Sequence, residues 1–553
     1  MRVFEAVAEE IHRQGVGRVF TLMSQETTKL TSELDRRGVR VYHARHEHVA
    51  VGMADGYARA TGEVGVAIVG MGPGLTNSMN ALLTASKARS PVLVIAGETA
   101  EVEGATHAQA KQARLVNKYI DQPALFDTLG IVHVDLRSEA SVVPQLRSAF
   151  ASVRDRARLI AVDLPFQLLE GEAGSVSAPA SGTGAPPPIS HTDVANVCDL
   201  LEASFAAKHP IIVAGRGAAR SSARDELVRL GRITGALLGT SVMGKGLFAE
   251  EPYDVGVIGT FATPVASELL RQADVVLAFG ASLNQHTTFF GEIFGKARIV
   301  QIDSDRLALR RHTDADIAIH ADARDAATAI ANELERRGHQ AEGYRTPDIA
   351  ARLAAVTHEP FTDRTGSEGI DPRSLMIGLD RVLPRPRTIV IDAGNHMAFP
   401  IRYLSVEDDA GFVWPMEYSA VGCSLGVALG VALARPDRHV VLFIGDGGMM
   451  MTLADLDTAV RYRIPIVIVV SNDSAFGAEL HYLREQGYDD AQTRYANPRF
   501  ADVARALGLE AITVASLAEL PKVKDRLVRT DVPLLLDCRV TAEVYGDFHT
   551  SLQ

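Results

Sequence analysis

Two short stretches, Gly445-Asp446-Gly447-Gly448-Met449 and Asn472-Asp473-Ser474-Ala475, decide the predicted fold, and their first aspartates are 27 residues apart. The run 440–444 before the first stretch is apolar and rich in β-branched residues, which is typical of a buried strand, and residues 449–462 have helical spacing. Glycines in such a turn let a phosphate approach the backbone, and the free N–H groups of a helix start favour an anion. We therefore expect a sheet with an anion site at its carboxyl edge.

The aspartate in this turn indicates a cation as well as an anion. A carboxylate repels a phosphate unless a cation lies between them. A second apolar strand is expected over 465–470, and it ends at Asp473 and Ala475, which add a side-chain oxygen and a backbone carbonyl at the same edge. With two diphosphate oxygens these groups offer the oxygen shell that Mg²⁺ requires. The alternative is an ordinary turn of an α/β sheet.

The combination of Gly-Asp-Gly with a later Asn-Asp resembles the diphosphate motif of thiamine-diphosphate (ThDP) enzymes of the acetolactate synthase, benzoylformate decarboxylase and benzaldehyde lyase group. The resemblance implies that Mg²⁺ is bound by Asp446, Asp473 and the carbonyl of Ala475. It also implies that ThDP contacts several residues of the same two loops, which are Gly445, Gly447, Gly448, Phe476 and Gly477. The family usually has Asn where this chain has Asp473, so the site here is more negative.

A second motif is Arg45-His46-Glu47, which lies between a predicted strand over 39–43 and a predicted helix. A glutamate at such a junction can be held away from water, which raises its pKa as a general acid requires. Followed by a helix that ends Gly-Tyr-Ala-Arg, the motif resembles the family's catalytic glutamate, and Glu47 would then hydrogen-bond N1′ of the aminopyrimidine. The alternative is a carboxylate that only complements the helix dipole.

The segments after this helix add further candidates. The turn over 70–77 resembles the family's Gly-Pro-Gly-x-Thr-Asn turn, which implies that Gly72 and Asn77 lie near the pyrimidine, although an ordinary strand-to-helix loop has the same composition. The polar segment 98–121 contains His107, Gln109 and Gln112, and relatives have a substrate-facing glutamine or histidine in this region. We take His107 and Gln112 as catalytic candidates, and a solvated loop is the alternative.

The first strand ends in a turn that departs from the family. Relatives have a glycine-rich turn there, whereas this chain has Thr21-Leu22-Met23-Ser24-Gln25-Glu26. Because that turn borders the substrate cavity in the family, the substrate cannot be transferred from the resemblance.

Length and composition limit the remaining classes. At 553 residues, with roughly 150 residues per domain, three or four domains are expected. The net charge of −12 argues against a nucleic-acid partner. The three cysteines form no metal-binding spacing and suit a reducing cytoplasm, the N-terminus lacks the pattern of a signal peptide, and no apolar run approaches the roughly 18 residues of a membrane span.

Two polar segments divide the chain. The stretch 171–192 is rich in Gly, Ala, Ser and Pro, which is typical of a linker, and 341–370 is a second polar segment. We therefore predict a pyrimidine-binding domain over 1–170, a Rossmann-like middle domain over 193–340 and a diphosphate-binding domain over 371–553. Each is expected to be a doubly wound parallel α/β sheet.

The middle domain poses a cofactor question. Gly215-x-Gly217 follows a predicted strand, but Arg220 stands where a dinucleotide fingerprint has its third glycine. Some relatives bind FAD in this domain and others bind nothing, and the Arg-rich run of the FAD-binding acetolactate synthases is missing. Whether FAD binds here is left open, and a middle domain without a bound flavin is favoured.

The last domain contributes three more candidates. The resemblance implies that the carbonyl of Ser419 accepts a hydrogen bond from the 4′-amino group and that Val421 supports the bent cofactor, although the family usually has a larger side chain there. Glu479 occupies a position where pyruvate decarboxylase-like relatives have a proton-handling glutamate, and a surface carboxylate is the alternative. His396 and His481 are interpreted as structural.

The resemblance extends over the whole chain and implies an enzyme. We expect a ThDP- and Mg²⁺-dependent carboligase that decarboxylates a 2-oxo acid and adds the remaining fragment to a second carbonyl, as acetolactate synthase does. A simple 2-oxo acid decarboxylase, a hydroxyketone or diketone lyase, and an inactive cofactor-binding regulatory subunit are the alternatives. The family builds its site between two subunits. The resemblance therefore implies at least a homodimer, and a homotetramer is expected.

Overall fold

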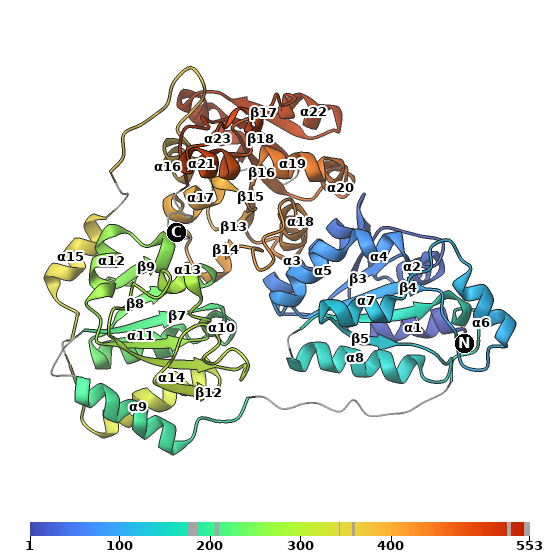
Figure 1. The fold of residues 1–553 in the computed structure, drawn as a ribbon, viewed down its shortest axis with the longest axis horizontal. Helices are drawn as coiled ribbons and strands as arrows, with labels where there is room; N and C mark the ends of the chain where they lie inside the picture. The colour runs from blue at the N-terminus through green and yellow to red at the C-terminus, as the bar shows by residue number, and fades with distance from the viewer. Residues whose placement is uncertain are drawn as a thin grey trace.

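The computed structural model describes residues 1–156, 158–174, 186–204, 209–341, 343–356, 360–527 and 532–546. They form three α/β domains, each built on a six-stranded sheet whose paired strands are all parallel (Figure 1). This confirms the predicted fold class. The predicted linker 171–192 lies partly outside the described residues.

The first sheet has the strand order β2-β1-β3-β4-β6-β5. Its strands are β1 (Arg18–Thr21), β2 (Arg40–His43), β3 (Gly65–Val69), β4 (Val92–Glu98), β5 (Val132–Asp135) and β6 (Ile160–Pro165). The helices of this domain are α1 (Val3–Arg13), α2 (Thr28–Arg36), α3 (Glu47–Thr61), α4 (Pro73–Asn77), α5 (Met79–Lys87), α6 (His107–Arg114), α7 (Gln122–Leu129) and α8 (Val142–Arg156). Strands β3 and β4 are buried throughout, which explains their continuous apolar sequences.

The second sheet has the order β12-β11-β10-β7-β8-β9. Its strands are β7 (Pro210–Ala214), β8 (Leu237–Thr240), β9 (Asp254–Val257), β10 (Val275–Phe279), β11 (Arg298–Asp303) and β12 (Ile317–His320). The helices of this domain are α9 (His191–Ser204), α10 (Arg216–Arg220), α11 (Arg224–Thr234), α12 (Pro264–Arg271), α13 (Gln285–Thr288), α14 (Ala323–Arg336) and α15 (Pro347–Ala355).

The third sheet has the order β14-β13-β15-β16-β18-β17. Its strands are β13 (Arg387–Ile391), β14 (Phe412–Val413), β15 (His439–Gly445), β16 (Ile466–Asn472), β17 (Glu510–Val514) and β18 (Leu534–Arg539). The helices are α16 (Pro372–Val382), α17 (Ala398–Tyr403), α18 (Ser424–Ala434), α19 (Asp446–Thr452), α20 (Leu456–Arg461), α21 (Gly477–Glu485), α22 (Phe500–Ala506) and α23 (Leu520–Leu527).

Three predicted segments differ from the structure. The helical segment expected over 449–462 is present but not uniform, because α19 ends at Thr452, a 3-10 turn covers Leu453–Asp455 and α20 starts at Leu456. At this turn Asp455 accepts hydrogen bonds from Arg45 N at 2.7 Å and Thr458 Oγ1 at 2.8 Å. The polar segments 98–121 and 341–370 contain helices α6 and α15.

The second of these segments is tied to the middle domain rather than free of it. The Tyr344 hydroxyl donates to the carbonyl of Leu269 at 2.8 Å, and Arg352 pairs with Glu268 at 2.7 Å. A short polar sequence resembles a linker, but these contacts attach its first half to α12.

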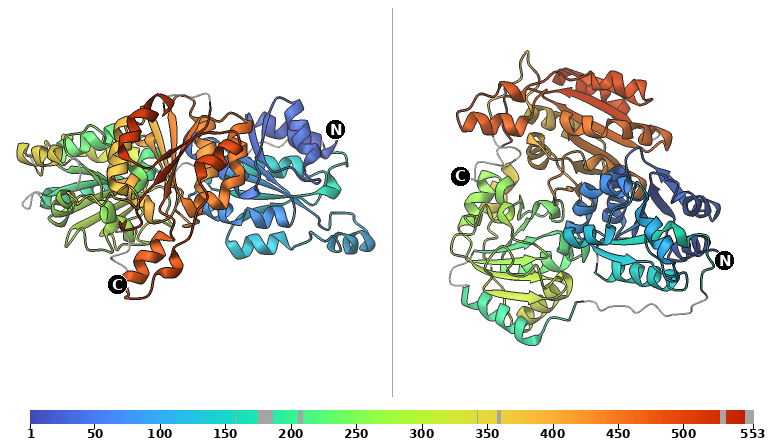
Figure 2. Two further views of the ribbon diagram at one scale, coloured as in Figure 1. Left: turned by 90° about the horizontal axis from the view of Figure 1, so that it is seen from above. Right: turned by 45° about the vertical axis from the view of Figure 1, so that its right-hand side comes forward.

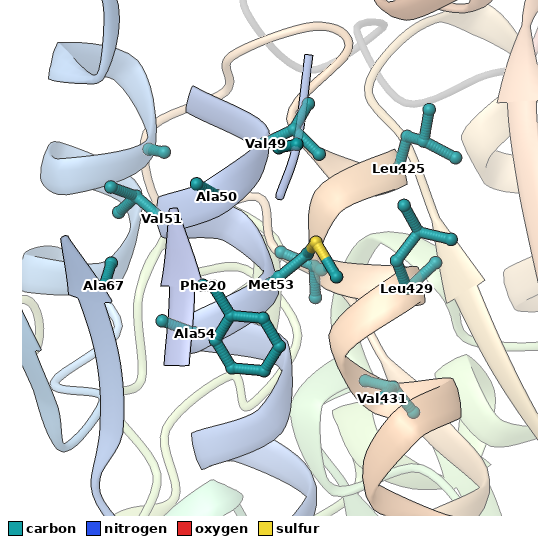
Figure 3. Packing of buried hydrophobic residues seen from close by; sticks show 14 of the residues in the cluster. Phe20, Val49, Ala50, Val51, Met53, Ala54, Ala67, Leu425, Leu429 and Val431 are labelled. Atoms are coloured by element: carbon teal, nitrogen blue, oxygen red, sulfur yellow. The ribbon is translucent and has the colours of Figure 1, made fainter. Parts of the chain in front are cut away.

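Helices α3 and α18 lie side by side between the first and third domains, which adjoin in each view (Figures 1 and 2). Helix α18 is apolar on all sides, as expected of a helix covered on every face. Val49 and Met53 of α3 and Leu425 and Leu429 of α18 belong to one buried cluster (Figure 3). The largest hydrophobic cluster of the chain therefore extends across two domains.

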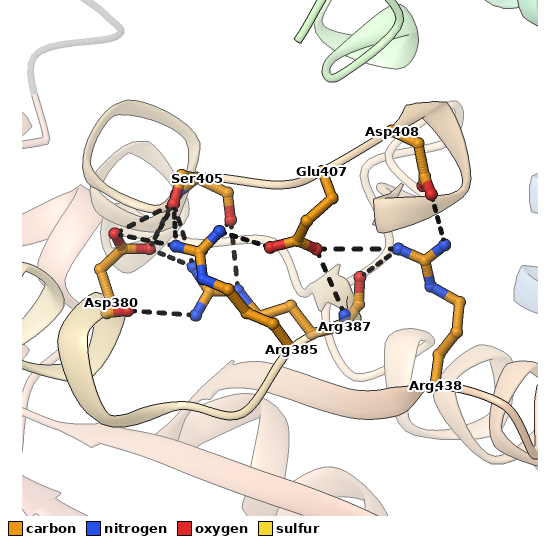
Figure 4. A network of polar contacts seen from close by, with 7 residues as sticks. All are labelled: Asp380, Arg385, Arg387, Ser405, Glu407, Asp408 and Arg438. Atoms are coloured by element: carbon orange, nitrogen blue, oxygen red, sulfur yellow. Dashed lines mark hydrogen bonds and ion pairs between the residues drawn. The ribbon is translucent and has the colours of Figure 1, made fainter. Parts of the chain in front are cut away.

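A polar network closes the amino edge of the third sheet (Figure 4). Its centre is the fully buried side chain of Arg387 at the start of β13, which donates to the carbonyl of Ser405 at 2.7 Å and pairs with Asp380. Lys245 of the second domain donates to the carbonyl of Ile401 at 2.5 Å nearby. The network lies at the opposite edge from the predicted site, and the Lys245 bond links the second domain to the third.

Candidate functional site

Strand register places the two motif loops next to each other. In the ladder between β15 and β16, Gly445 is the partner of Ser471. The residues that follow, Asp446 and Asp473, therefore leave the carboxyl edge of the sheet together. This is the edge at which open α/β sheets bind ligands.

Asp446 is buried and accepts hydrogen bonds from four donors. Its Oδ1 accepts from Gly447 N at 2.7 Å and from the Tyr495 hydroxyl at 3.0 Å. Its Oδ2 accepts from Ser474 N at 2.8 Å and from Asn497 Nδ2 at 2.6 Å. Burial nevertheless raises the pKa of Asp446 above its usual value.

Asp473 is the second carboxylate at this edge. Burial, and then the charge of Asp446, raise the pKa of Asp473 to about 8. Its Oδ1 accepts only from Ala475 N, at 3.1 Å, among the described hydrogen bonds. Two neighbouring carboxylates, one buried and one half-buried, that resist ionisation gain from a cation between them.

The donor set fits Mg²⁺. It consists of two carboxylates and the backbone carbonyl of buried Ala475, all hard oxygen ligands, and it leaves positions for phosphate oxygens. Among the described residues no cluster of three His, Cys, Asp or Glu side chains forms a cage for a metal ion. The oxygens present suit a cation shared with a diphosphate.

His396 adjoins the diphosphate turn, which sequence reasoning missed. A Cβ atom on Gly445 would lie 3.0 Å from its Nδ1, so the glycine makes room for the ring. The side chain is 8% exposed, and its Nε2 has no hydrogen-bond partner in the part of the chain that the structure describes. Burial lowers the pKa of His396 to about 4, and an adjacent anion would favour the protonated, donating ring.

The loop before α18 carries Ser419 and Val421. Ser419 has a φ of 56°, in the left-handed region that non-glycine residues rarely adopt, and such strain is concentrated at functional sites. Val421 is 40% exposed.

Asp392, at the end of β13, holds this loop in place. Its carboxylate accepts from Gly422 N at 2.9 Å and from Ser424 N at 3.3 Å. Burial raises its pKa to about 6. The position of an aspartate directly after an apolar strand is the sequence signal that would have identified it.

Glu47 is the first residue of α3 and is half-buried at the carboxyl edge of the first sheet. Its Oε2 accepts from Asn77 Nδ2 at 3.0 Å, and its Oε1 lies 3.4 Å from where a Cβ on Gly74 would be. The structure therefore brings together the Arg-His-Glu motif and the glycine-rich turn.

No residue with a side chain fits at the position of Gly72 in that turn. Its φ is 56°, and a Cβ would meet the carbonyl oxygen of Lys118 at 2.2 Å. Its N–H donates to Gln122 Oε1 at 3.3 Å, and Gln122 Nε2 donates to buried Asp163 at 2.7 Å. Gln122 was not among the predicted residues, since nothing in its sequence context distinguishes it.

The unusual turn after β1 lies against the same edge. Ser24 Oγ is 2.8 Å from where a Cβ on Gly70 would lie, and Glu26 accepts from Lys118 Nζ at 2.8 Å. The Lys118 ammonium lowers the pKa of Glu26, although burial acts in the opposite direction. A partly exposed ion pair thus stands where the family has glycines.

Other predicted residues are not brought to Glu47. His107 and Gln112 are exposed on α6, at the outer end of the first domain (Figure 1). Glu479 is exposed in the first turn of α21, on the side of Asp446 and close enough for its charge to act on Tyr495. Among the described residues no hydrogen bond or ion pair joins Glu47 to Asp446 or Asp473.

The glycines of the middle domain serve packing. A Cβ on Gly215 would lie 2.2 Å from the carbonyl oxygen of Gly280, and one on Gly217 would lie 2.6 Å from its Cα. The backbone of the neighbouring strand end, rather than an open turn, explains both residues.

Comparison with known proteins identifies the family. Three family models match consecutive parts of the chain: the N-terminal TPP binding domain of thiamine pyrophosphate enzymes over 1–118, their central domain over 195–330, and their C-terminal TPP binding domain over 392–538. The chain belongs to the thiamine pyrophosphate enzyme family. It is thus a ThDP-dependent enzyme, as the two motifs predicted.

Individual relatives cover nearly the whole chain. A putative acetolactate synthase large subunit IlvB2 from Mycobacterium tuberculosis is 28% identical and covers 98% of both chains. A sulfoacetaldehyde acetyltransferase from Alcaligenes xylosoxydans xylosoxydans is 26% identical, over 98% of this chain and 94% of its own. The solved structure of a Rhodococcus jostii RHA1 thiamine diphosphate-dependent 4-hydroxybenzoylformate decarboxylase matches the fold with a TM-score of 0.81 at 21% identity, over 98% of this chain and 99% of its own.

Proposed function

We propose that this ThDP enzyme is an Mg²⁺-dependent carboligase of the acetolactate synthase type, which decarboxylates a 2-oxo acid and joins the fragment to a second carbonyl compound. The observation that carries the cofactor assignment is the set formed by Asp446, Asp473 and the carbonyl of Ala475 at one sheet edge. The acetolactate synthase relative, which matches the chain from end to end, supports the reaction type.

Each group of the chain has a defined task in this proposal. Asp446, Asp473 and the Ala475 carbonyl would hold the cation, and the N–H of the His396 ring would be available to donate to the diphosphate. ThDP, when bound, supplies the thiazolium ring that accepts the electron pair released by decarboxylation. Glu47, oriented by Asn77, donates a proton to N1′ of the aminopyrimidine.

The loop before α18 positions the pyrimidine ring. The carbonyl of Ser419, which has a left-handed backbone conformation, would accept from the 4′-amino group, and exposed Val421 would support the bent cofactor. Asp392 keeps both residues in place through its two bonds to the following backbone.

A homodimer is part of the proposal. Four apolar side chains around the candidate site are exposed, namely Val421, Met450, Met451 and Phe476. Glu47 of the same chain contacts none of the cation ligands, so a second copy that supplies its Glu47 would complete the site and cover this surface. Light scattering of the purified protein tests this, and a monomer at micromolar concentration would contradict it.

A flavin is not part of the proposal. The packing of Gly215 and Gly217 against Gly280 leaves no open glycine turn for a pyrophosphate. The visible absorption spectrum of purified protein checks this, since bound FAD would give a flavin band.

The environment of the chain is also a proposal. The three cysteines are buried and unpaired, which suits a reducing cytoplasm. In the described residues, no helix combines the length and apolar character needed to cross a bilayer.

A non-oxidative 2-oxo acid decarboxylase is the second candidate, because Glu479 lies at the same edge as the cation ligands and is exposed for proton delivery. Proton NMR of the protein with ThDP, Mg²⁺ and pyruvate, and then with benzoylformate, separates the two. Acetolactate from pyruvate is the expected product. An aldehyde as the sole product would favour the decarboxylase, and the Glu479→Gln variant would then lose its formation.

A further inference from the structure

Tyr495 occupies the position where the proposed cation ligands meet. Its hydroxyl donates to Asp446 Oδ1 at 3.0 Å and also lies 3.2 Å from the carbonyl oxygen of Ala475. It also lies 3.6 Å from where a Cβ on Gly447 would be. One hydroxyl therefore lies beside two cation ligands and the second glycine of the diphosphate turn.

The carboxylate of Asp446 has no lone pair left in this arrangement. A carboxylate offers about four acceptor positions, and four donors fill them. A cation that binds Asp446 must displace one donor. The N–H groups of Gly447 and Ser474 belong to the backbone of the turns, so a side chain has to leave.

Tyr495 is the side chain that can leave with the least disturbance. Its backbone is fixed by a bond from Tyr495 N to the carbonyl of Ser474 at 3.1 Å, next to a bond from Phe476 N to the carbonyl of Thr493 at 2.8 Å. Its ring is half-buried and packs only against Phe476 among the described aromatic pairs, with centroids 4.8 Å apart, and Phe476 is itself 54% exposed. Rotation of the side chain frees the hydroxyl without moving the backbone.

Asn497, the other side-chain donor, is held more firmly. Its Nδ2 also donates to the side chain of Asn472 at 3.0 Å, and Asn472 is anchored to buried Asp537 at 2.9 Å. These bonds connect Asn497 to the core of the sheet. The geometry thus makes Asn497 a fixed partner of Asp446 and Tyr495 a movable one.

We propose that Tyr495 is a latch over the cation site: its hydroxyl holds Asp446 and the Ala475 carbonyl, and it leaves them when a divalent cation and a diphosphate bind. This inference rests on the proposed function and adds a residue that controls cofactor loading. Tyr495 is a positioning residue and takes no part in the reaction. Removing its hydroxyl lowers the cost of opening the site.

The test compares wild type with Tyr495→Phe after EDTA treatment, using Mn²⁺ with ThDP as the probe and electron paramagnetic resonance of free Mn²⁺ as the readout. The variant is expected to bind Mn²⁺ about three- to tenfold more tightly, the effect of one ordinary hydrogen bond. The melting temperature of the variant without cation should be lower than that of wild type. Addition of Mn²⁺ and ThDP should raise the melting temperature of the variant by more than that of wild type. Tyr482→Phe, which changes a 59% exposed tyrosine on α21, is the matched control and should equal wild type.

The outcomes separate the latch from the proposed function. Equal or weaker Mn²⁺ binding by Tyr495→Phe, with normal binding by wild type, overturns the latch alone. No Mn²⁺-dependent ThDP binding by either protein overturns both.

A crystal structure of wild type with Mn²⁺ and ThDP gives a readout that does not depend on the variant's folding. The Tyr495 hydroxyl is expected away from Asp446 Oδ1. A hydroxyl that still donates to Asp446 beside the bound cation would overturn the latch.

Discussion

At the scale of single residues, carboxylates of the same kind behave differently because of their neighbours. Burial alone would raise the pKa of Glu417, but the charges of Arg59 and Arg216 lower it below its usual value. Burial and the charge of Asp446 raise the pKa of Asp473 to about 8, against the smaller opposing effect of Arg494. The first residue stabilises the fold as an anion, whereas the second requires a cation to ionise.

Glu47→Gln tests the proton donor. The amide keeps the size of the side chain and a contact with Asn77 but has no carboxyl proton to give. We expect kcat to fall by about 10²- to 10⁴-fold, the usual contribution of general acid catalysis, while ThDP still binds. Steady-state kinetics and a ThDP titration measure both quantities, and unchanged activity would refute the role of Glu47.

Asp446→Ala tests the cation site. Removal of this ligand should abolish Mg²⁺-dependent ThDP binding, because Asp473 and the Ala475 carbonyl alone hold the cation weakly. Calorimetric titration with ThDP and Mg²⁺ measures binding, and circular dichroism of the variant should show a retained fold. ThDP affinity equal to that of wild type would exclude Asp446 as a ligand.

Asp163 provides a pH prediction away from the cation site. It is fully buried, and burial followed by the charge of Glu98 raises its pKa to about 8. The folded protein therefore binds this proton over a pH range in which the unfolded chain, with a pKa near 3.9, has lost it. The free energy of unfolding should fall as the pH rises from about 4 to about 8.

Asp163→Asn should remove that part of the pH dependence, since the amide does not titrate and still accepts from Gln122. Urea unfolding of both proteins at pH 5 and pH 8 gives the comparison. The difference between the two pH values is expected to be smaller for the variant. An identical difference in both proteins would show that Asp163 is ionised in the folded state.

At the scale of elements, the contact between α3 and α18 depends on glycines. A Cβ on Gly56 would lie 2.0 Å from the carbonyl oxygen of Val427, and one on Gly430 would lie 2.1 Å from that of Met53. The two backbones touch where Glu47 begins one helix and the Ser419 loop leads into the other. Close packing of these helices thus fixes the positions of two site segments.

Gly56→Ala should therefore separate the two helices. Because the obstacle is backbone, the structure cannot adapt by moving a side chain, and we expect a loss of at least about 1–3 kcal/mol in the free energy of unfolding. Gly17→Ala is the matched control, since a Cβ there meets nothing within 4 Å. Equal urea midpoints for the two variants would contradict the packing argument.

At the scale of the whole molecule, one junction joins all three domains. Arg59 of α3 donates to both oxygens of Glu417, at 2.9 and 3.0 Å, and Arg216 of α10 donates to the same carboxylate at 2.5 Å. Glu417 lies two residues before Ser419. One carboxylate therefore links α3 and α10 to the loop that contains Ser419.

Glu417→Gln breaks this junction and leaves the charge of Arg59 buried beside Asp55 alone. We expect a cost of about 3–5 kcal/mol, as for other buried ion pairs that lose one partner, together with a raised KM for ThDP. Glu335→Gln, in an exposed pair with Arg229, should cost less than about 1 kcal/mol. Urea unfolding and ThDP titration of both variants provide the measurement, and equal losses would exclude the junction as a stabilising feature.

The sequence by itself determined the fold class, the family and the expected cation ligands. Apolar runs that end in Gly-Asp-Gly and Asn-Asp predict neighbouring parallel strands, and the register of β15 and β16 places their ends together. These features are local, because hydrophobic period and turn chemistry act over a few neighbouring residues. The same locality explains why helical spacing over 449–462 does not reveal the 3-10 turn at Leu453–Asp455, where Asp455 accepts a hydrogen bond from Arg45, about 400 residues away in the chain.

Only the tertiary structure decided which distant side chains share the site. Tyr495 meets Asp446, Gln122 supports Gly72, and Glu417 joins Arg59 to Arg216. None of these pairs has a spacing or motif, because each forms where separate elements fold against one another. Burial has the same origin: it raises the pKa of Asp473 and leaves the Nε2 of His396 without a partner among the described residues, and no single-residue property of the sequence contains it.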